Sequence, residues 1–283
     1  MEKIDLKEMK NIRLIALDLD GTLLTTDKRL TERNRTALRA AAEAGIDIVP
    51  TTGRISSGMP DSVKQLDFVR FVIAANGAQI IDRTDGSTIF RAEIPWEEAY
   101  GIMEHLDTLP VIYDCYMDDL GYMSQEQWDR IEEFAPNEYY VMLQRRLCGT
   151  VPDLKEFVRT SEKGIQKIKF FFKDMDLRAR QLTELQERYP QLIVTSSIVN
   201  NIEINHPLAN KGEAIRNLAA HLGLDISQTM AFGDGLNDIS MIKEAGVGVA
   251  MANAWPEVAE CADIITASCD EDGVAQVIEQ LLQ

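Results

Sequence analysis

Short apolar runs alternate with amphipathic stretches at both ends of the chain. Near the start, apolar runs at 14–17, 46–49 and 71–75 are separated by stretches at 31–44 and 57–66 with helical spacing. Near the end, apolar runs lie at 229–232, 247–251 and 262–266, and helices are predicted at 211–222, from 238 to 245 and at 273–282. Alternating strands and helices predict a parallel sheet with right-handed crossovers. The expected fold class is α/β, with a Rossmann-like three-layer core.

The middle of the chain follows a different pattern. Residues 80–90 read as a hairpin, followed by predicted helices at 96–109, 125–134 and 177–189 and strands at 111–116, 165–172 and 192–195. Polar and apolar residues alternate from Lys167 to Phe170, which predicts an antiparallel sheet with one face in water. We therefore expect a core of residues 1–85 and 201–283, with 202–204 as a core strand, and an inserted α/β cap domain at 86–200.

Composition narrows the function classes. The 283 residues carry a formal net charge of −17, which repels nucleic-acid phosphates and requires any phosphate site to be locally positive. The charged start, 1–13, lacks the apolar core of a signal peptide, and no apolar run reaches the length of a membrane span. The four cysteines have no paired spacing. We expect a reduced, cytoplasmic protein with no nucleic-acid or membrane partner.

Two carboxylates follow the first predicted strand. Asp18 and Asp20 are two residues apart, and side chains at that spacing on a strand point the same way. Two like charges at the end of a buried strand are costly unless a metal ion or a lysine neutralises them. The alternative is a solvated turn, for which the Asp-Gly pair is suitable.

Three more polar clusters follow strand ends or open helices: Thr51-Thr52-Gly53, Asn210-Lys211-Gly212, and Asp234 with Asn237 and Asp238. Each alone can be a helix cap, a solvated lysine or a tight turn. Together with the two aspartates they supply a nucleophile, hard oxygen ligands, a hydroxyl, backbone N–H groups and a lysine. That inventory suits phosphoryl transfer with Mg²⁺.

Four motifs carry a family resemblance: DLDGTLL at 18–24, TTGR at 51–54, NKG at 210–212 and GDGLND at 233–238. The sequence resembles the haloacid dehalogenase superfamily, and specifically its Cof-type phosphatases. The stretch 231–273 is also similar, with Cys269 where that pattern has asparagine. The resemblance implies a Mg²⁺-dependent phosphatase acting on small phosphorylated metabolites, with sugar phosphates favoured. We expect a monomer or a weak homodimer.

The resemblance also implies roles for the matched positions. Asp18 would be the nucleophile that forms an aspartyl-phosphate, and Asp20 would act as general acid and then general base. The implied metal ligands are Asp18, the backbone carbonyl of Asp20, and Asp234, with Asp238 as a direct or outer partner. The implied phosphate-binding groups are Leu19, Thr52, Gly53, Lys211 and Asn237. Asn76 would contact substrate or position Asp18, whereas Arg54 has no derived role.

Some branches of the superfamily fit less well. Halide leaves without a proton, so Asp20 argues against a dehalogenase, and the lack of a predicted membrane span argues against a P-type ATPase.

Two alternatives stay open. A phosphomannomutase-like sugar phosphomutase would use cationic cap residues among Arg145, Arg146, Lys167 and Lys169, although a solvated surface is the simpler interpretation of them. A non-catalytic phosphometabolite-binding regulator would have no need of the intact motifs.

Overall fold

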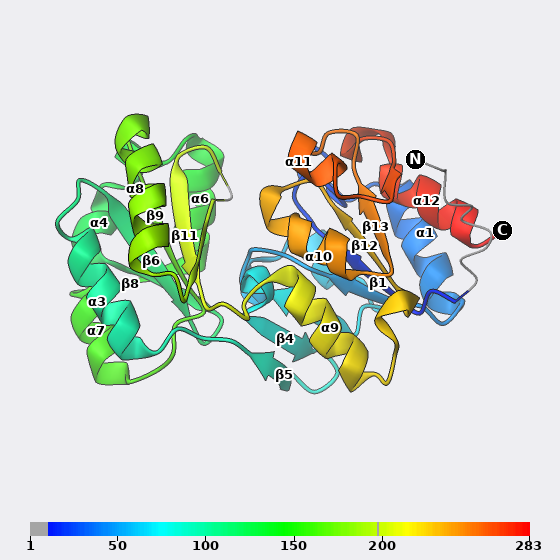
Figure 1. Ribbon diagram of the computed structural model, residues 1–283, viewed down its shortest axis with the longest axis horizontal. Helices are drawn as coiled ribbons and strands as arrows, with labels where there is room; N and C mark the ends of the chain where they lie inside the picture. The colour runs from blue at the N-terminus through cyan, green and yellow to red at the C-terminus, as the bar shows by residue number, and fades with distance from the viewer. Residues whose placement is uncertain (1–10, 197) are drawn as a thin grey trace. The chain divides into compact units, whose positions relative to one another are not determined.

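The computed structural model describes residues 11–196 and 198–283 (Figure 1). The stretch 1–10, on which part of the signal-peptide expectation rests, lies outside them. The chain divides into two compact units. Among the described residues, the first comprises 11–53, 59–91 and 210–283, and the second comprises 54–58 and 92–209. Among the residues described, we find no helix that combines the length and the apolar character needed to cross a bilayer.

A parallel sheet forms the centre of the first unit, with strand order β14-β13-β12-β1-β2. Its strands are β1 (Leu14–Leu17), β2 (Asp47–Pro50), β12 (Thr229–Gly233), β13 (Val247–Ala250) and β14 (Ile264–Ile265). In the register, Leu14 faces Asp47 on one side and Thr229 on the other, so the two ends of the chain meet at β1. The predicted α/β class is confirmed.

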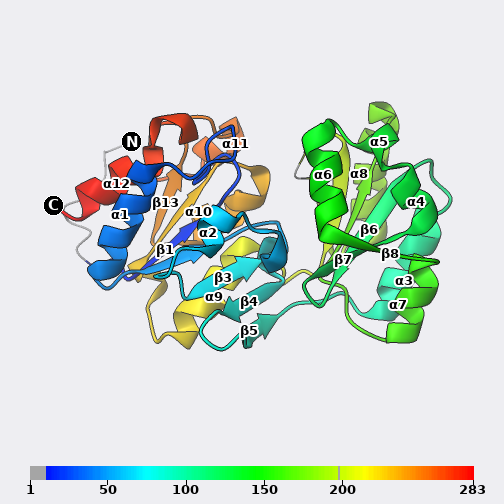
Figure 2. The ribbon, with the colours of Figure 1, turned by 180° about the vertical axis from the view of Figure 1, so that it is seen from behind.

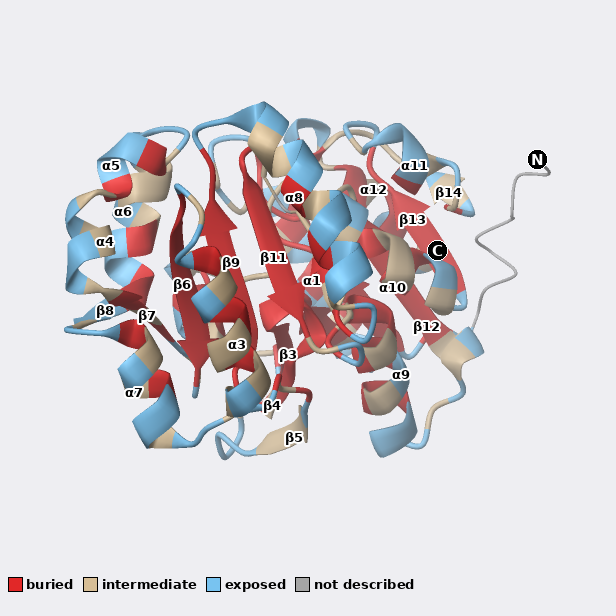
Figure 3. Cartoon of the chain, turned by 60° about the vertical axis from the view of Figure 1, so that its left-hand side comes forward, coloured by how far each residue is buried: buried red, intermediate tan, exposed pale blue. Residues whose placement is uncertain are grey.

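Helices cover both faces of this sheet (Figures 1 and 2). On one face lie α1 (Glu32–Glu43), α2 (Asp61–Lys64) and α12 (Gly273–Leu281), and on the other α9 (Lys211–His221), α10 (Ile239–Glu244) and α11 (Pro256–Ala259). All four residues of β1 are 0% exposed, because apolar side chains meet them from both layers. The buried strands appear red between the partly exposed helices in Figure 3.

Two predicted elements of this unit, the third strand and the second helix, form within their expected ranges but differ in pairing and in length. The third strand, β3 (Phe71–Ala74), pairs antiparallel with β4 (Gln79–Asp82), which pairs with β5 (Thr88–Arg91). Only one parallel bridge, Thr51 to Ile73, links it to the end of β2. The helix predicted at 57–66 is shorter, because Pro60 has no N–H to donate and α2 starts only after it.

The second unit is built on a six-stranded sheet with order β10-β11-β9-β6-β7-β8. Its strands are β6 (Ile112–Met117), β7 (Leu120–Ser124), β8 (Cys148–Val151), β9 (Lys167–Phe171), β10 (Ile193–Thr195) and β11 (Asn201–Asn205). Its helices are α3 (Trp96–Leu106), α4 (Gln125–Asp129), α5 (Ile131–Phe134), α6 (Glu138–Leu147), α7 (Leu154–Ser161) and α8 (Met175–Arg188). The sequence patterns did not predict α6, α7, β7 or β8. Apolar side chains of α3, α7 and α8 pack on one face, and those of α4, α5 and α6 on the other.

Strand β11 corrects the expectation that residues 202–204 return to the core. It pairs antiparallel with β9 and β10, and Ile202 and Ile204 pack into the apolar cluster of the second unit. The residue pattern of a short strand does not reveal which sheet it joins. By contacts, 86–91 belong to the first unit and 201–209 to the second, several residues away from the boundaries expected at 85 and 200.

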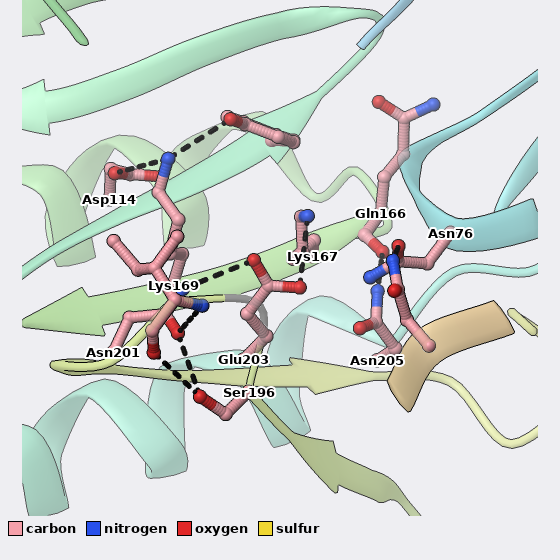
Figure 4. Close-up of polar contacts among 12 residues, drawn as sticks. Asn76, Asp114, Gln166, Lys167, Lys169, Ser196, Asn201, Glu203 and Asn205 are labelled. Carbon is pink, nitrogen blue, oxygen red and sulfur yellow. Dashed lines mark hydrogen bonds and ion pairs between the residues drawn. The ribbon is translucent and has the colours of Figure 1, made fainter. Parts of the chain in front are cut away.

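The polar face of β9 is not in water, contrary to the prediction. Lys167 and Lys169 are 2% and 9% exposed. The ammonium of Lys167 lies 3.2 Å from Glu203, and that of Lys169 lies 2.9 Å from Oε1 of Gln144 and 3.4 Å from Asp114 (Figure 4). Buried charges persist only when they are paired and hydrogen-bonded. The alternation therefore marks a polar interior rather than a solvated face.

Candidate active site

The polar motifs of the first unit gather at one edge of its parallel sheet. Asp18 follows β1, Thr51 follows β2, and Asp234 follows β12. Lys211 is the first residue of α9, whose N-cap is Asn210. The carboxyl ends of parallel strands meet at the same edge, which is where α/β sheets bind ligands.

A buried lysine joins two of these motifs. Lys211 is 0% exposed, and its Nζ lies 2.5 Å from Oδ1 of Asp18 and 2.5 Å from Oδ1 of Asp238. Burial alone would lower the pKa of Lys211, but the two carboxylates outweigh it and raise that pKa above its ordinary value. The buried side chain of Lys211 therefore stays protonated and positively charged.

Asp18 lies against this cation in surroundings that disfavour its charge. Its side chain is nearly buried, and its amide donates to the carbonyl of Phe232 at 3.0 Å. Burial raises the pKa of Asp18 well above its ordinary value, as do the charges of Asp238 and Asp234, although Lys211 opposes the shift. The ionised carboxylate of Asp18 thus needs more positive charge than Lys211 alone provides.

The loop after β12 folds around the carboxylate of Asp238. Oδ2 of Asp238 accepts the backbone N–H groups of Asp234 and Gly235, each at 2.9 Å, while its Oδ1 meets Lys211. Both oxygens of this fully buried side chain are therefore engaged. They fix the loop that carries Asp234.

Asp234 is a partly exposed acid whose surroundings also disfavour its charge. Its Oδ1 accepts the hydroxyl of Thr22 at 2.7 Å. Burial, followed by the charge of Asp238, raises the pKa of Asp234 to about 6, although the bond from Thr22 and the charges of Lys211 and Lys28 oppose that rise. The Thr22 bond also joins the first motif to the fourth.

Asp18, Asp234 and Asp238 form an acidic cluster suited to a divalent cation. Each offers a carboxylate oxygen, and the three oxygens lie within 4.8 Å of one another. Three carboxylates and one ammonium leave a formal charge of −2 (−3 + 1), and the pKa values of Asp18 and Asp234 are raised. Hard carboxylate oxygens with uncompensated charge fit a hard cation such as Mg²⁺.

The second aspartate of the first motif has a different cation. Strand β1 ends at Leu17, so the strand alternation that would orient Asp18 and Asp20 alike does not continue through them. The Asp20 carboxyl instead lies 3.0 Å from Nζ of Lys28. The Asp20 side chain thus has its own cationic partner, and that Asp18 and Asp20 address one point in space stays a prediction.

Gly21 permits this turn. Its φ of +95° lies in the region that favours glycine, and a Cβ there would collide with the carboxylate of Asp234. Its carbonyl accepts the side-chain amide of Asn253 at 2.8 Å. The glycine thus lets the first motif approach the loop after β12.

Two of the predicted phosphate-binding residues, Thr52 and Asn237, are linked by hydrogen bonds through Asn76. The carbonyl of Thr52 accepts the amide of Asn76 at 3.0 Å, and Oδ1 of Asn76 accepts Nδ2 of Asn237 at 3.1 Å. A Cβ on Gly53 would lie 2.7 Å from Oδ1 of Asn76, so glycine allows this approach. Asn76 itself has a φ of +60°.

Two other predicted positions have different surroundings. The Leu19 side chain is 0% exposed, and its carbonyl accepts the amide of Leu24 at 2.8 Å, so only its backbone remains for a polar role. Arg54 belongs to the second unit, where its guanidinium donates to the hydroxyl of Tyr139 at 2.7 Å and to the carbonyl of Gly58 at 3.2 Å.

Sequence reasoning missed three contributors: Thr22, Lys28 and Asn253. Thr22 stands inside the first motif, so its signal was available. Asn253 lies in the stretch 231–273 that carries part of the family resemblance, but nothing in the sequence indicates its hydrogen bond to Gly21. Lys28 is a single lysine in a polar loop, and only the fold places it beside Asp20.

Comparisons with known proteins agree with one another. A family model described as haloacid dehalogenase-like hydrolase matches residues 15–278. The 5-amino-6-(5-phospho-D-ribitylamino)uracil phosphatase YcsE of Bacillus subtilis is 33% identical over 276 residues, 96% of this chain and 96% of that protein. Phosphatase YwpJ of the same organism is 30% identical, covering 96% of this chain and 100% of that one. A solved haloacid dehalogenase-like hydrolase from Bacteroides thetaiotaomicron is similar with a TM-score of 0.81 and 28% identity, over 95% of this chain and 99% of that one.

Proposed function

Because this chain belongs to the haloacid dehalogenase-like hydrolase family and is a phosphoric monoester hydrolase, we propose that it hydrolyses small phosphorylated metabolites, sugar phosphates foremost, through an aspartyl-phosphate on Asp18 with Mg²⁺ bound. The observation that carries the proposal is the cluster of Asp18, Asp234 and Asp238, in which the buried ammonium of Lys211 pairs with Asp18 and Asp238. It combines a nucleophile with the positive charge that an anionic substrate needs.

The chemistry begins at Asp18. Its Oδ1 is held by Lys211, so Oδ2 attacks phosphorus while the bond to the leaving oxygen breaks. An alkoxide is a poor leaving group, and Asp20 gives it a proton. Ionised Asp20 then takes a proton from a water molecule, whose oxygen attacks phosphorus, releasing phosphate and restoring the Asp18 carboxylate.

The groups that would hold Mg²⁺ are Asp18, the backbone carbonyl of Asp20, and Asp234. When bound, Mg²⁺ supplies the charge that lets an anionic nucleophile approach an anionic phosphate. Oδ1 of Asp234 accepts from Thr22, so Oδ2 is the oxygen left for a cation. Both oxygens of Asp238 are engaged, which favours its outer role: it fixes the loop and the direction of Lys211.

The phosphate oxygens are held by hydrogen-bond donors around the nucleophile. These are the Thr52 hydroxyl, the backbone N–H groups of Leu19 and Gly53, the Asn237 amide and the Lys211 ammonium. Asn76 orients Asn237 through the 3.1 Å bond between their side chains. Fixed donors of this kind stabilise the charge that develops on the transferring group.

Support for the substrate class comes from the relatives. The name of the Bacillus subtilis YcsE phosphatase describes a phosphate on a ribityl chain, which is a polyol phosphate. The mutase alternative needs uncompensated cations in the inserted domain. Lys167 and Lys169 each lie beside a carboxylate, and Arg145 pairs with Glu132, so these charges are already balanced.

The test is phosphate release from a panel of sugar, polyol and nucleoside monophosphates, with Mg²⁺ and with a chelator. We expect release that requires the metal and varies across the panel. Release from no member would refute the proposed hydrolysis. Isomerisation of a sugar phosphate without release, in the presence of its bisphosphate, would establish the mutase instead.

Two variants test the named roles. Asp18→Asn should abolish release with an unchanged circular dichroism spectrum, whereas the exposed Asp67→Asn should match wild type. Asp20→Asn should lose more kcat/KM on alkyl than on aryl phosphates, because phenolate leaves without a full proton transfer. An acid quench of Asp20→Asn should also leave a phosphoryl group on the peptide that contains Asp18. Equal losses on both substrate types would remove Asp20 as the acid.

A further inference from the structure

A lysine that none of the matched motifs contains lies beside the proposed general acid. Nζ of Lys28 is 3.0 Å from Oδ1 of Asp20, and each side chain is 33% exposed. The pair connects two residues of the same unit, eight positions apart in the chain (28 − 20). The ammonium therefore engages one specific oxygen of the carboxyl that exchanges protons.

The loop around Lys28 has a defined shape. The amide of Lys28 donates to the carbonyl of Thr25 at 2.8 Å, and the amide of Thr25 donates to the carbonyl of Arg29 at 3.0 Å. The Thr25 hydroxyl accepts the Arg29 amide at 3.1 Å and closes the loop. Lys28 has a φ of +60°, in the left-handed region, so this backbone would suit glycine better than lysine.

The same loop is tied to the C-terminal part of the chain. The amide and the hydroxyl of Thr26 donate to the two oxygens of Asp270, at 2.8 and 2.6 Å. Just after the loop, Thr31 donates to Asp272 at 2.5 Å. A loop held at both points brings its side chains to fixed places. Lys28 occupies a backbone conformation that favours glycine, and the loop around it is held in place. A lysine at such a position indicates that its side chain has a role.

We propose that Lys28 is a positioning residue for Asp20, an inference that rests on the proposed function. The ammonium donates to Oδ1 of Asp20 and fixes the plane of the carboxyl, whose second oxygen, Oδ2, carries the exchanged proton. In the first step, Oδ2–H gives its proton to the leaving oxygen as the phosphorus–oxygen bond to that group breaks and the bond to Asp18 forms. In the second step, the same Oδ2 takes a proton from water.

A purely structural role makes a different prediction. Exposed ion pairs contribute little to stability, and replacing a left-handed lysine by glycine relieves backbone strain. If Lys28 served only the fold, Lys28→Gly would leave catalysis unchanged or lower the rates on every substrate alike. If Lys28 orients the acid, the loss depends on how much the leaving group needs a proton.

The experiment compares Lys28→Gly, Lys28→Arg and the matched control Arg29→Met. Arg29 is the neighbouring cation in the same loop, and its guanidinium pairs with Asp27 at 3.2 Å instead of with Asp20. For each protein, kcat/KM is measured on p-nitrophenyl phosphate and on a sugar phosphate that wild type hydrolyses. This parameter reports steps up to formation of the phosphoenzyme, in which Asp20 acts as the acid. Thermal midpoints are recorded alongside.

We expect Lys28→Gly to lose about tenfold or more of kcat/KM on the sugar phosphate and less than about threefold on the aryl phosphate, a fraction of what general acid catalysis contributes. Its thermal midpoint should equal or exceed that of wild type. Lys28→Arg should recover most of the loss, and Arg29→Met should match wild type.

Equal effects of Lys28→Gly on the two substrates would overturn the inference, as would Lys28→Arg behaving like Lys28→Gly. The two failures are distinguishable, because an inactive wild type would refute the proposed function. If Asp20→Asn shows the leaving-group dependence and Lys28→Gly does not, only the role of Lys28 is refuted.

Discussion

Replacing Lys211 by methionine should expose how much of this site depends on one buried cation. The ammonium is 0% exposed and lies 2.5 Å from both Asp18 and Asp238. Methionine has similar length and no charge, so the change leaves two buried carboxylates without their partner. Breaking a buried ion pair by removing one partner costs about 3–5 kcal/mol. For a chain of this size we expect the thermal midpoint to fall by about 6–15 °C.

The loss of stability caused by Lys211→Met should depend on pH. The pKa of Asp18 is already raised by burial and by its acidic neighbours, and Lys211 is the group that opposes this rise. Without Lys211 the pKa rises further. A carboxyl whose pKa is higher in the folded state stabilises the fold below its unfolded pKa, and that contribution is lost as pH rises through the folded pKa. The gap in stability between variant and wild type should therefore be widest above the raised pKa of Asp18 and should shrink as pH falls through that pKa.

The assay is unfolding followed by circular dichroism in a chelator at several pH values. Lys243→Met, at an exposed lysine in the last turn of α10, is the matched control and should stay within about 0.5 kcal/mol of wild type. Adding Asp18→Asn to Lys211→Met should recover part of the lost stability, because it removes one of the two buried carboxylates that have lost their cationic partner. A loss below about 1 kcal/mol at every pH would refute the reasoning that Lys211 compensates buried charge.

Three further outcomes follow from the packing. Gly21→Ala should cost about 2 kcal/mol or more and most of the activity, because φ is +95° and a Cβ would meet Asp234; thermal unfolding and phosphate release check both. Lys167→Met should destabilise the second unit by about 3–5 kcal/mol, and adding Glu203→Met should restore stability, as a double-mutant cycle will show. Thr31→Ala removes the N-cap of α1 and should cost about 1 kcal/mol in denaturant unfolding.

The sequence by itself determined the α/β class, the two-part core and the motifs of the candidate site. Apolar runs and helical spacing are local properties, so β1, α1, β12 and α12 could be predicted from their own residues. Polar groups at strand ends were enough to predict that Asp18 and Asp234 would meet, because parallel strands share a carboxyl edge, whereas Lys211 opens a helix and reaches them through the fold.

The tertiary structure decided what depends on partners far away in the chain. Strand β11 joined the second unit because its apolar residues pack there, and β3 joined an antiparallel hairpin. The alternation in β9 was the same whether its lysines met water or the carboxylates of Glu203 and Asp114, and only the fold distinguishes these cases. Lys28 carried no local signal, since its place beside Asp20 comes from a loop tied to Asp270. Hydrophobic periodicity depends only on residues that are close in the sequence. The partner of a charged side chain depends on which distant segments pack together in the fold.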